Sequence, residues 1–160
     1  MTYIGIDNGV SGTIGILTDT DSYFYETPVK KHLKYTKKKA FLSRIDHIEL
    51  KKLFMSFDFP FTIFVERPMV NPKRFTASAS ALRALEATLI VLEQLGLPYE
   101  FIDSKEWQKA VLPKGIKGQA ALKEASKLKG IQLYPMFKKE IEKHKDADGL
   151  LIAHYLKYIK

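Results

Sequence analysis

Three short apolar segments of this chain each carry a carboxylate at one end. Two of them are rich in β-branched residues and end at Asp7 and at Glu66, while the third opens a helix candidate that holds Asp148. An acid at the end of a buried strand is unfavourable unless something compensates its charge. A fold that brings the three acids together creates an oxygen-rich site of the kind that Mg²⁺ or Mn²⁺ prefers.

Length and composition bound the kind of protein. The 160 residues, 46% of them hydrophobic, predict a single domain over residues 1–160 with a real core. The chain has no cysteine, which excludes disulfides and thiolate zinc sites. A formal net charge of +8 at pH 7 favours a polyanion such as nucleic acid as the partner.

The N-terminus carries no secretory pattern, because it opens directly into a strand-type segment without a basic stretch and an apolar core. No uninterrupted apolar run of membrane-spanning length is evident. We therefore expect a cytoplasmic protein without a membrane partner.

Hydrophobic periodicity and turn residues predict an α/β domain. Strands that alternate with helices later in the chain indicate parallel pairing, and two early strands joined by a short Gly-containing turn indicate an antiparallel N-terminal meander. The predicted fold is thus a mixed central sheet flanked by helices. The expected strands are residues 2–7, 12–18, 22–28, 61–66 and 98–102, and the expected helices are residues 47–57, 76–95, 119–129 and 147–159, with a short one after Ser104.

The acids are expected to share one crevice. In α/β sheets ligands gather beyond the carboxyl ends of strands, where Asp7 and Glu66 stand. Asp148 lies four residues before Ile152, on the inward face of the last helix. Asp146 can join them only from a non-helical position, and N-capping is its alternative role. Turn stabilisation is the alternative for Asp7, and an ion pair with Arg67 is the alternative for Glu66.

Each acid stands in a short motif with small or apolar neighbours. Glycine follows within two residues of Asp7 and directly after Asp148, whereas a proline ends the strand that carries Glu66. The motifs are Ile4-Gly5-Ile6-Asp7-Asn8-Gly9, Val65-Glu66-Arg67-Pro68 and Ala147-Asp148-Gly149-Leu150-Leu151-Ile152-Ala153.

These motifs resemble the RuvC-type Holliday junction resolvases, especially the small phage-encoded ones, over nearly the whole chain. The resemblance implies a ribonuclease H-like fold and a homodimer that cuts four-way DNA junctions by paired nicks. It also implies that Asp7, Glu66 and Asp148 bind two Mg²⁺ ions, for which Mn²⁺ can substitute. A phage-encoded enzyme of this kind would work in the cytoplasm of its bacterial host.

The sequence departs from the family pattern at two places. The family usually has a fourth metal ligand three residues before the helical aspartate, where this chain has Lys145. Asp146 and His144 are the candidate replacements, and we favour Asp146. The family often places an aromatic residue three residues after the strand glutamate, to enter the junction centre. Met69 occupies that position, and Phe75 of the same loop is the alternative wedge.

Three acid-poor stretches are candidates for the DNA-facing surface. They are residues 30–39, residues 67–85 and the region 103–130, which has seven lysines and three acids. Lysines there would contact phosphates, although a solvated basic face is the alternative for each. Trp107 is assigned to the core rather than to base stacking. The candidate nucleic-acid-binding residues are Met69, Lys73, Arg74, Phe75, Lys105, Lys109, Lys117 and Lys123.

Other functions fit parts of the same pattern. A nuclease for flaps, forks or branched DNA in general would use the same acids. The loop at residues 5–13 also resembles the phosphate loop of actin-like sugar kinases, but those need two such domains. A junction-binding protein without chemistry gains nothing from clustered acids. Two symmetric nicks need a twofold dimer, for which the helix at residues 76–95 is the candidate surface, an intramolecular contact being its alternative.

Overall fold

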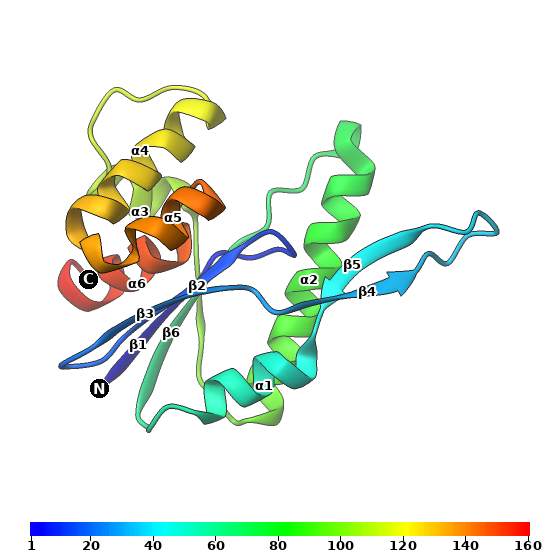
Figure 1. The fold of residues 1–160 in the computed structure, drawn as a ribbon, viewed down its shortest axis with the longest axis horizontal. Coiled ribbons are helices and arrows are strands. Elements are labelled where there is room, and N and C mark those ends of the chain that lie inside the picture. Colours follow the sequence, from blue (N-terminus) through cyan, green and yellow to red (C-terminus); the bar gives the residue numbers. More distant parts are fainter.

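A five-stranded mixed sheet forms the centre of the computed structural model, which describes residues 1–160 (Figure 1). Its strand order is β3-β2-β1-β6-β7, with β1 antiparallel to β2 and parallel to β6. The predicted N-terminal meander and the later parallel strands are both confirmed. The strands are β1 (Thr2–Ile6), β2 (Thr13–Leu17), β3 (Ser22–Glu26), β6 (Phe61–Glu66) and β7 (Glu100–Ile102).

Helices cover both faces of this sheet, and each face has its own hydrophobic core. The alternation of side chains along β6 illustrates why, since Phe64 enters one core while Ile63 and Val65 enter the other. One face carries α1 (His47–Met55) and α2 (Phe75–Gln94). The other carries α3 (Ser104–Val111), α4 (Gln119–Leu133), α5 (Lys138–His144) and α6 (Asp148–Tyr158), with 3₁₀ turns η1 (Pro72–Arg74) and η2 (Pro135–Phe137) elsewhere in the chain.

Helix α6 lies directly on the backbone of β1 and β2 because glycine occupies each point of contact. A Cβ atom on Gly5 or Gly15 would overlap the α6 backbone, and one on Gly149 would overlap the carbonyl of Thr13. The Gly149 N–H donates to Thr13 Oγ1 at 3.0 Å across the same contact. This close approach places the start of α6 at the carboxyl end of β1, where Asp7 follows.

Two elements were not predicted from the sequence. Residues 29–45 form a separate antiparallel ribbon of β4 (Val29–Leu33) and β5 (Phe41–Ile45), which stands apart from the main sheet beyond α2 (Figure 1). Helix α5 is the second. Both are rich in lysine, so neither shows the apolar periodicity on which the predictions depended.

Helix α2 corrects the expectation about apolar length. The stretch Pro72–Gln94 is long and apolar enough to cross a membrane by length and composition alone. A single such helix is weak evidence for a membrane span, and core helices of soluble proteins pass the same test. Here Ala84, Val91 and Leu92 pack into the core beneath the sheet, so α2 is part of the folded domain.

Candidate metal centre

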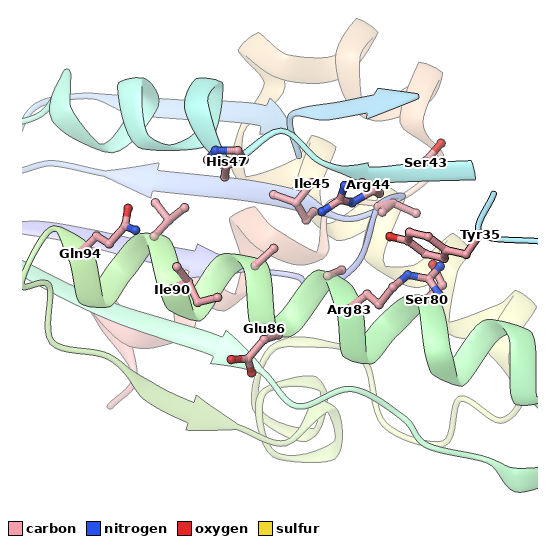
Figure 2. A pocket seen from close by; sticks show the side chains of 14 residues that line it. Tyr35, Ser43, Arg44, Ile45, His47, Ser80, Arg83, Glu86, Ile90 and Gln94 are labelled. Atoms are coloured by element: carbon pink, nitrogen blue, oxygen red, sulfur yellow. The ribbon is translucent and has the colours of Figure 1, made fainter. Parts of the chain in front are cut away.

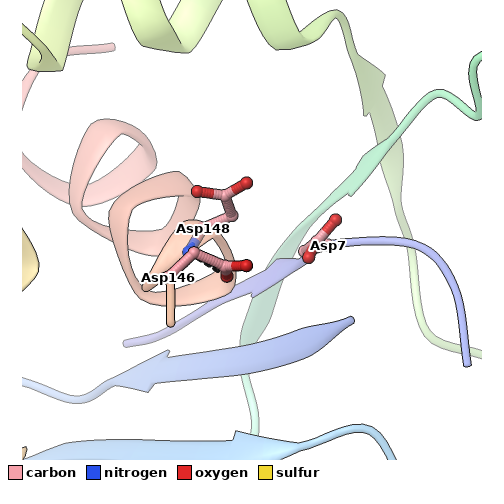
Figure 3. Close-up of side chains that lie close together, drawn as sticks. All are labelled: Asp7, Asp146 and Asp148. Atoms are coloured by element: carbon pink, nitrogen blue, oxygen red, sulfur yellow. Dashed lines mark hydrogen bonds between the residues drawn. The ribbon is translucent and has the colours of Figure 1, made fainter. Parts of the chain in front are cut away.

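Four acids from three parts of the chain converge at the carboxyl end of the sheet. Carboxylate oxygens of Asp7, Asp146 and Asp148 all lie within 4.8 Å of one another (Figure 3). Glu66, at the end of the neighbouring strand β6, is close enough for its charge to act on Asp7. The structure therefore brings Asp7, Asp146 and Asp148 together and places Glu66 beside Asp7, while their role as metal ligands stays a prediction.

Asp7 enters the cluster from the turn that follows β1. Its N–H donates to the Thr13 carbonyl at 3.0 Å, which continues the β1–β2 ladder by one residue. The next residue, Asn8, donates through Nδ2 to the Ala81 carbonyl of α2 at 3.1 Å. The turn is thus fastened on both sides by other groups, and the Asp7 carboxylate faces the other acids instead of stabilising the turn.

Glu66 is held by the side chain of Trp107 on α3. The Trp107 indole Nε1–H donates to Glu66 Oε1 at 2.8 Å, and the indole is 0% exposed. The alternative role of Glu66, an ion pair with Arg67, does not occur, because Arg67 pairs with Asp103 at 3.0 Å. The assignment of Trp107 to the core is confirmed, but its role in orienting Glu66 was not predicted.

Asp148 is the first residue of α6 and is held by Ser126 of α4. The Ser126 hydroxyl donates to Asp148 Oδ1 and accepts from the Ala147 N–H at 3.1 Å. One buried serine therefore ties the carboxylate and the preceding backbone to the same point. Sequence reasoning missed Ser126 because a serine within a lysine-rich helix carries no signal of its own.

Asp146 lies before α6 in a non-helical position, which is the position expected if it joins the other acids. It is only 3% exposed and accepts a 3.4 Å hydrogen bond from the Asp148 N–H, so it contributes to capping as well. Its charge is partly balanced by Lys123 Nζ at 3.6 Å, and His144 Nε2 lies 3.8 Å from its other oxygen.

Lys145, directly before Asp146, turns the chain between α5 and α6. It has a left-handed φ of 82° and is exposed. This turn puts Asp146, one residue later, into the cluster. His144 stands one step further out, behind Asp146, so the structure places Asp146 rather than His144 among the converging oxygens.

Burial and mutual repulsion shape the ionisation of the cluster. Burial raises the pKa of Asp7 well above its ordinary value, and the charges of Asp148, Glu66 and Asp146 raise it further. Burial and the charge of Asp146 raise the pKa of Asp148 to about 7, although the Ser126 hydrogen bond opposes this. Burial also raises the pKa of Glu66, against the Trp107 hydrogen bond.

The cluster fits a divalent cation because it concentrates oxygen ligands and negative charge in a buried place. One lysine, Lys123, pairs with one of the four acids, and no other lysine or arginine lies within 4.0 Å of them. Buried like charges without compensation are unfavourable, which a hard cation relieves. Asp7, Asp146 and Asp148, with Glu66 beside Asp7, are the residues that could hold it.

The two candidate wedge residues do not share one loop, because Met69 lies in the loop after β6 whereas Phe75 is the first residue of α2. Met69 is 70% exposed and Phe75 is 77% exposed. The loop is nonetheless anchored, because Ser78 Oγ accepts from the Asn71 N–H and donates to the Asn71 carbonyl, both at 2.9 Å. Lys73 and Arg74 form the exposed turn η1 within this loop.

The basic candidates of the region 103–130 are all exposed. Lys105 and Lys109 lie on α3, and Lys117 lies in the loop before α4. Lys123 stands apart from the other three, since it contacts the acid cluster through Asp146. The structure thus brings one of these lysines to the candidate metal centre and leaves the others on the surface.

Comparisons with known proteins support the fold. No family model and no curated protein matches the chain. The structure of T. thermophilus RuvC in complex with a Holliday junction substrate is similar, with a TM-score of 0.60 and 14% identity over 98% of this chain and 95% of that chain. A second Thermus thermophilus RuvC structure has a TM-score of 0.53 and 17% identity, over 96% and 90%.

The similarity extends over almost the whole length of both chains at low identity. The chain therefore has the ribonuclease H-like fold of RuvC, and the predicted fold class is confirmed. The resemblance to RuvC-type proteins is confirmed at the level of the fold. A phage origin stays a prediction.

Proposed function

We propose that this protein is a divalent-metal-dependent endonuclease that nicks DNA at four-way junctions. The observation that carries the proposal is the convergence of Asp7, Asp146 and Asp148 to within 4.8 Å, beside Glu66, at the end of the sheet. The fold shared with RuvC, one structure of which holds a Holliday junction substrate, supports junction DNA as the substrate.

Two of the four acids have a neighbouring side chain that orients them before any ligand binds. Trp107 fixes one oxygen of Glu66, and Ser126 fixes one oxygen of Asp148. The free oxygens of these carboxylates are left to bind a cation. Such preorganisation by surrounding hydrogen bonds is typical of metal ligands in enzymes.

Mg²⁺ is the cation we propose, with Mn²⁺ as a substitute, because all the ligands offered are carboxylate oxygens. Bound as a pair, such ions would activate water for attack on phosphorus and stabilise the leaving oxygen. The chain itself holds the ligands in place, and Lys123 supplies a positive charge beside a phosphate that enters the centre.

The protein would act as a homodimer, since resolving a junction requires two symmetric nicks and each chain offers one acid cluster. Helix α2 is our candidate for the dimer contact, because Leu82 and Ile90 on it are exposed. Met69 from the loop before α2, or Phe75 from the first turn of α2, would enter the junction centre. Lys73, Arg74, Lys105, Lys109 and Lys117 would bind the phosphates of its arms.

The decisive experiment measures nicking of a synthetic four-way junction with Mg²⁺, with Mn²⁺ and with EDTA. We expect paired nicks that need the metal and are lost in Asp7→Asn, which keeps its binding in a gel-shift assay. Asp19→Asn is the matched control, because Asp19 is an exposed acid beyond the opposite end of the strands. Equal loss of binding and nicking in Asp7→Asn would contradict the assignment of Asp7 as a metal ligand.

The same assay separates the alternatives. Flap and forked DNA nicked as fast as the junction would indicate a general branched-DNA nuclease. Turnover of ATP without nicking would point to the actin-like phosphotransferase. Tight junction binding with no nicking under any metal would leave a binding protein without chemistry.

A further inference from the structure

The β4–β5 ribbon is a feature that the proposed reaction does not use. Its register runs from Val29 opposite Ile45 to Leu33 opposite Phe41, and the Lys34 N–H closes the tip by donating to the Ala40 carbonyl at 2.8 Å. Figure 1 shows it projecting past α2, away from the helices α3–α6. Most of its side chains are exposed, and only Ile45 at its base enters the core.

The ribbon is cationic along its whole length. Residues 27–45 contain no acid, and none of its basic side chains has an acidic partner within 4.0 Å. Some lysines on helices elsewhere in the chain pair with acids, as Lys52 and Lys127 do, whereas none on the ribbon does. The basic residues of the ribbon are Lys30, Lys31, Lys34, Lys37, Lys38, Lys39 and Arg44.

Two of these charges face each other directly. Lys30 and Arg44 are cross-strand partners in the ladder, and like charges in that position destabilise a sheet. A two-stranded ribbon is only marginally stable by itself, so this arrangement works against its own fold. A polyanion bound along the ribbon removes the repulsion and turns the pair into a binding feature.

The ribbon and α2 each place one arginine at a shared cavity. A cavity of about 430 Å³ lies between the base of the ribbon and α2 (Figure 2). Half of its 14 lining residues are hydrophobic. The polar part of its wall has Arg44 from the ribbon, Arg83 from α2, the hydroxyl-bearing Tyr35, Ser43 and Ser80, and a single acid, Glu86. Arginine and hydroxyl side chains are groups that commonly contact phosphate oxygens and sugars of DNA.

We propose that the β4–β5 ribbon is an arm that binds the phosphate backbone of a DNA duplex. The inference rests on the proposed function only in taking DNA as the ligand. Its physical basis is charge complementarity, because seven unpaired cations on a projecting element would otherwise repel one another. The arm adds affinity for the duplex arms of the substrate without contributing to the chemistry.

The test compares two double variants that each remove two positive charges. Both are made in the Asp7→Asn background and measured in EDTA, so that DNA binding is measured without cleavage. Lys37→Gln with Lys38→Gln alters the exposed tip, and Lys51→Gln with Lys52→Gln alters α1 as the control. Affinity for a linear duplex and for a four-way junction is measured from 50 to 300 mM salt.

We expect the tip variant to reduce the slope of log affinity against log salt by about 2 for each bound protomer, and to weaken low-salt binding by about tenfold or more. The control should match the parent. Lys30→Gln should also weaken binding, while its unfolding temperature is equal to or above that of the parent because the repulsion with Arg44 is gone. Replacing a residue with a purely structural role is not expected to weaken DNA binding while it leaves the unfolding temperature unchanged or raises it.

An unchanged slope in the tip variant would overturn the inference. Two further results for the tip variant would also overturn it, each combined with DNA binding equal to that of the parent. One is lost binding to anionic vesicles, and the other is a changed oligomeric state in sedimentation. Nicking by the unsubstituted protein tests the proposed function separately. If the protein nicks no DNA but its salt slope still falls in the tip variant, the DNA-binding role of the ribbon stands and the proposed nuclease function fails.

Discussion

The indole of Trp107 donates a 2.8 Å hydrogen bond to the carboxylate of Glu66 across 41 residues of sequence. The bond joins α3 to the end of β6 and fixes one oxygen of an acid that is partly accessible at the candidate metal centre. It also favours the charged form of Glu66, against the burial that raises its pKa. Trp107 is therefore a positioning residue for a metal ligand.

Replacement of Trp107 by Phe keeps an aromatic ring in the core but removes the donor. We expect the Mg²⁺ concentration needed for half-maximal nicking to rise by about 10–100-fold, as for other residues that orient metal ligands. A metal titration of the nicking rate measures this. A variant that is less stable but has an unchanged Mg²⁺ requirement would show that Trp107 acts only through packing.

Asp146→Asn should lower nicking as strongly as Asp148→Asn, because Asp146 is buried among the converging oxygens and is not simply an exposed cap. Lys145→Gln is the matched control, since Lys145 is adjacent in sequence but exposed. Single-turnover nicking of all three variants at saturating protein makes the comparison. A near-normal rate in Asp146→Asn would remove it from the ligand set.

Stability of the metal-free protein should fall as pH rises. The folded-state pKa of Asp148 is raised from 3.8 to about 7, so between these values the folded chain keeps a proton that the unfolded chain releases. The stabilisation of the folded state by protonated Asp148 is fully present below about pH 4 and is lost as pH rises through about 7. Relative to Asp148→Asn, we expect the wild type to lose on the order of 1–3 kcal/mol between pH 5 and pH 8.

Thermal unfolding in EDTA at pH 5 and pH 8 tests this expectation. Each 1 kcal/mol of lost stability should lower the unfolding temperature by about 2–4 °C. Added Mg²⁺ should raise the unfolding temperature more at pH 8 than at pH 5, because metal and protons compete for the same oxygens. An equal Mg²⁺ effect at the two pH values would separate the binding of metal from the titration of Asp148.

Met69→Ala or Phe75→Ala should lower nicking of intact junctions and spare nicking of flexible branched DNA. Met69 is exposed in the loop after β6 and Phe75 is exposed at the start of α2, and an inserted apolar side chain can offset the few kcal/mol lost per unstacked base step. Met136→Ala is the matched control, since Met136 is 65% exposed on η2. Equal rate losses on rigid and flexible substrates would leave the loop as an ordinary backbone contact.

The acids could be predicted because their signals are local. Asp7 and Glu66 each follow an apolar, β-branched run, and a carboxylate in that position has few structural explanations. Asp148 was found from its spacing to Ile152 on the helix. A mixed α/β sheet with an antiparallel N-terminal meander follows from the order of strands and helices, since short connections and parallel pairing leave few arrangements. The ribonuclease H-like fold was implied by the resemblance of the motifs.

The partners of those acids could not be predicted in the same way. Trp107 and Ser126 are ordinary in their own segments, and their hydrogen bonds to Glu66 and Asp148 exist only because α3 and α4 pack beside the sheet. Lys123 was expected on the DNA-facing surface, yet it contacts Asp146. The β4–β5 ribbon has too many charges to show a strand pattern, so it was read only as a basic stretch.

The sequence by itself therefore determined which side chains carry the charge and which segments end at the same edge of the sheet, because hydrophobic periodicity and strand ends are properties of neighbouring residues. Only the tertiary structure decided how those charges are oriented, balanced and titrated. Burial, distance and hydrogen-bond geometry depend on residues far apart in the chain, such as the glycines that let α6 lie on β1 and β2 and the α3 and α4 side chains that contact Glu66, Asp146 and Asp148.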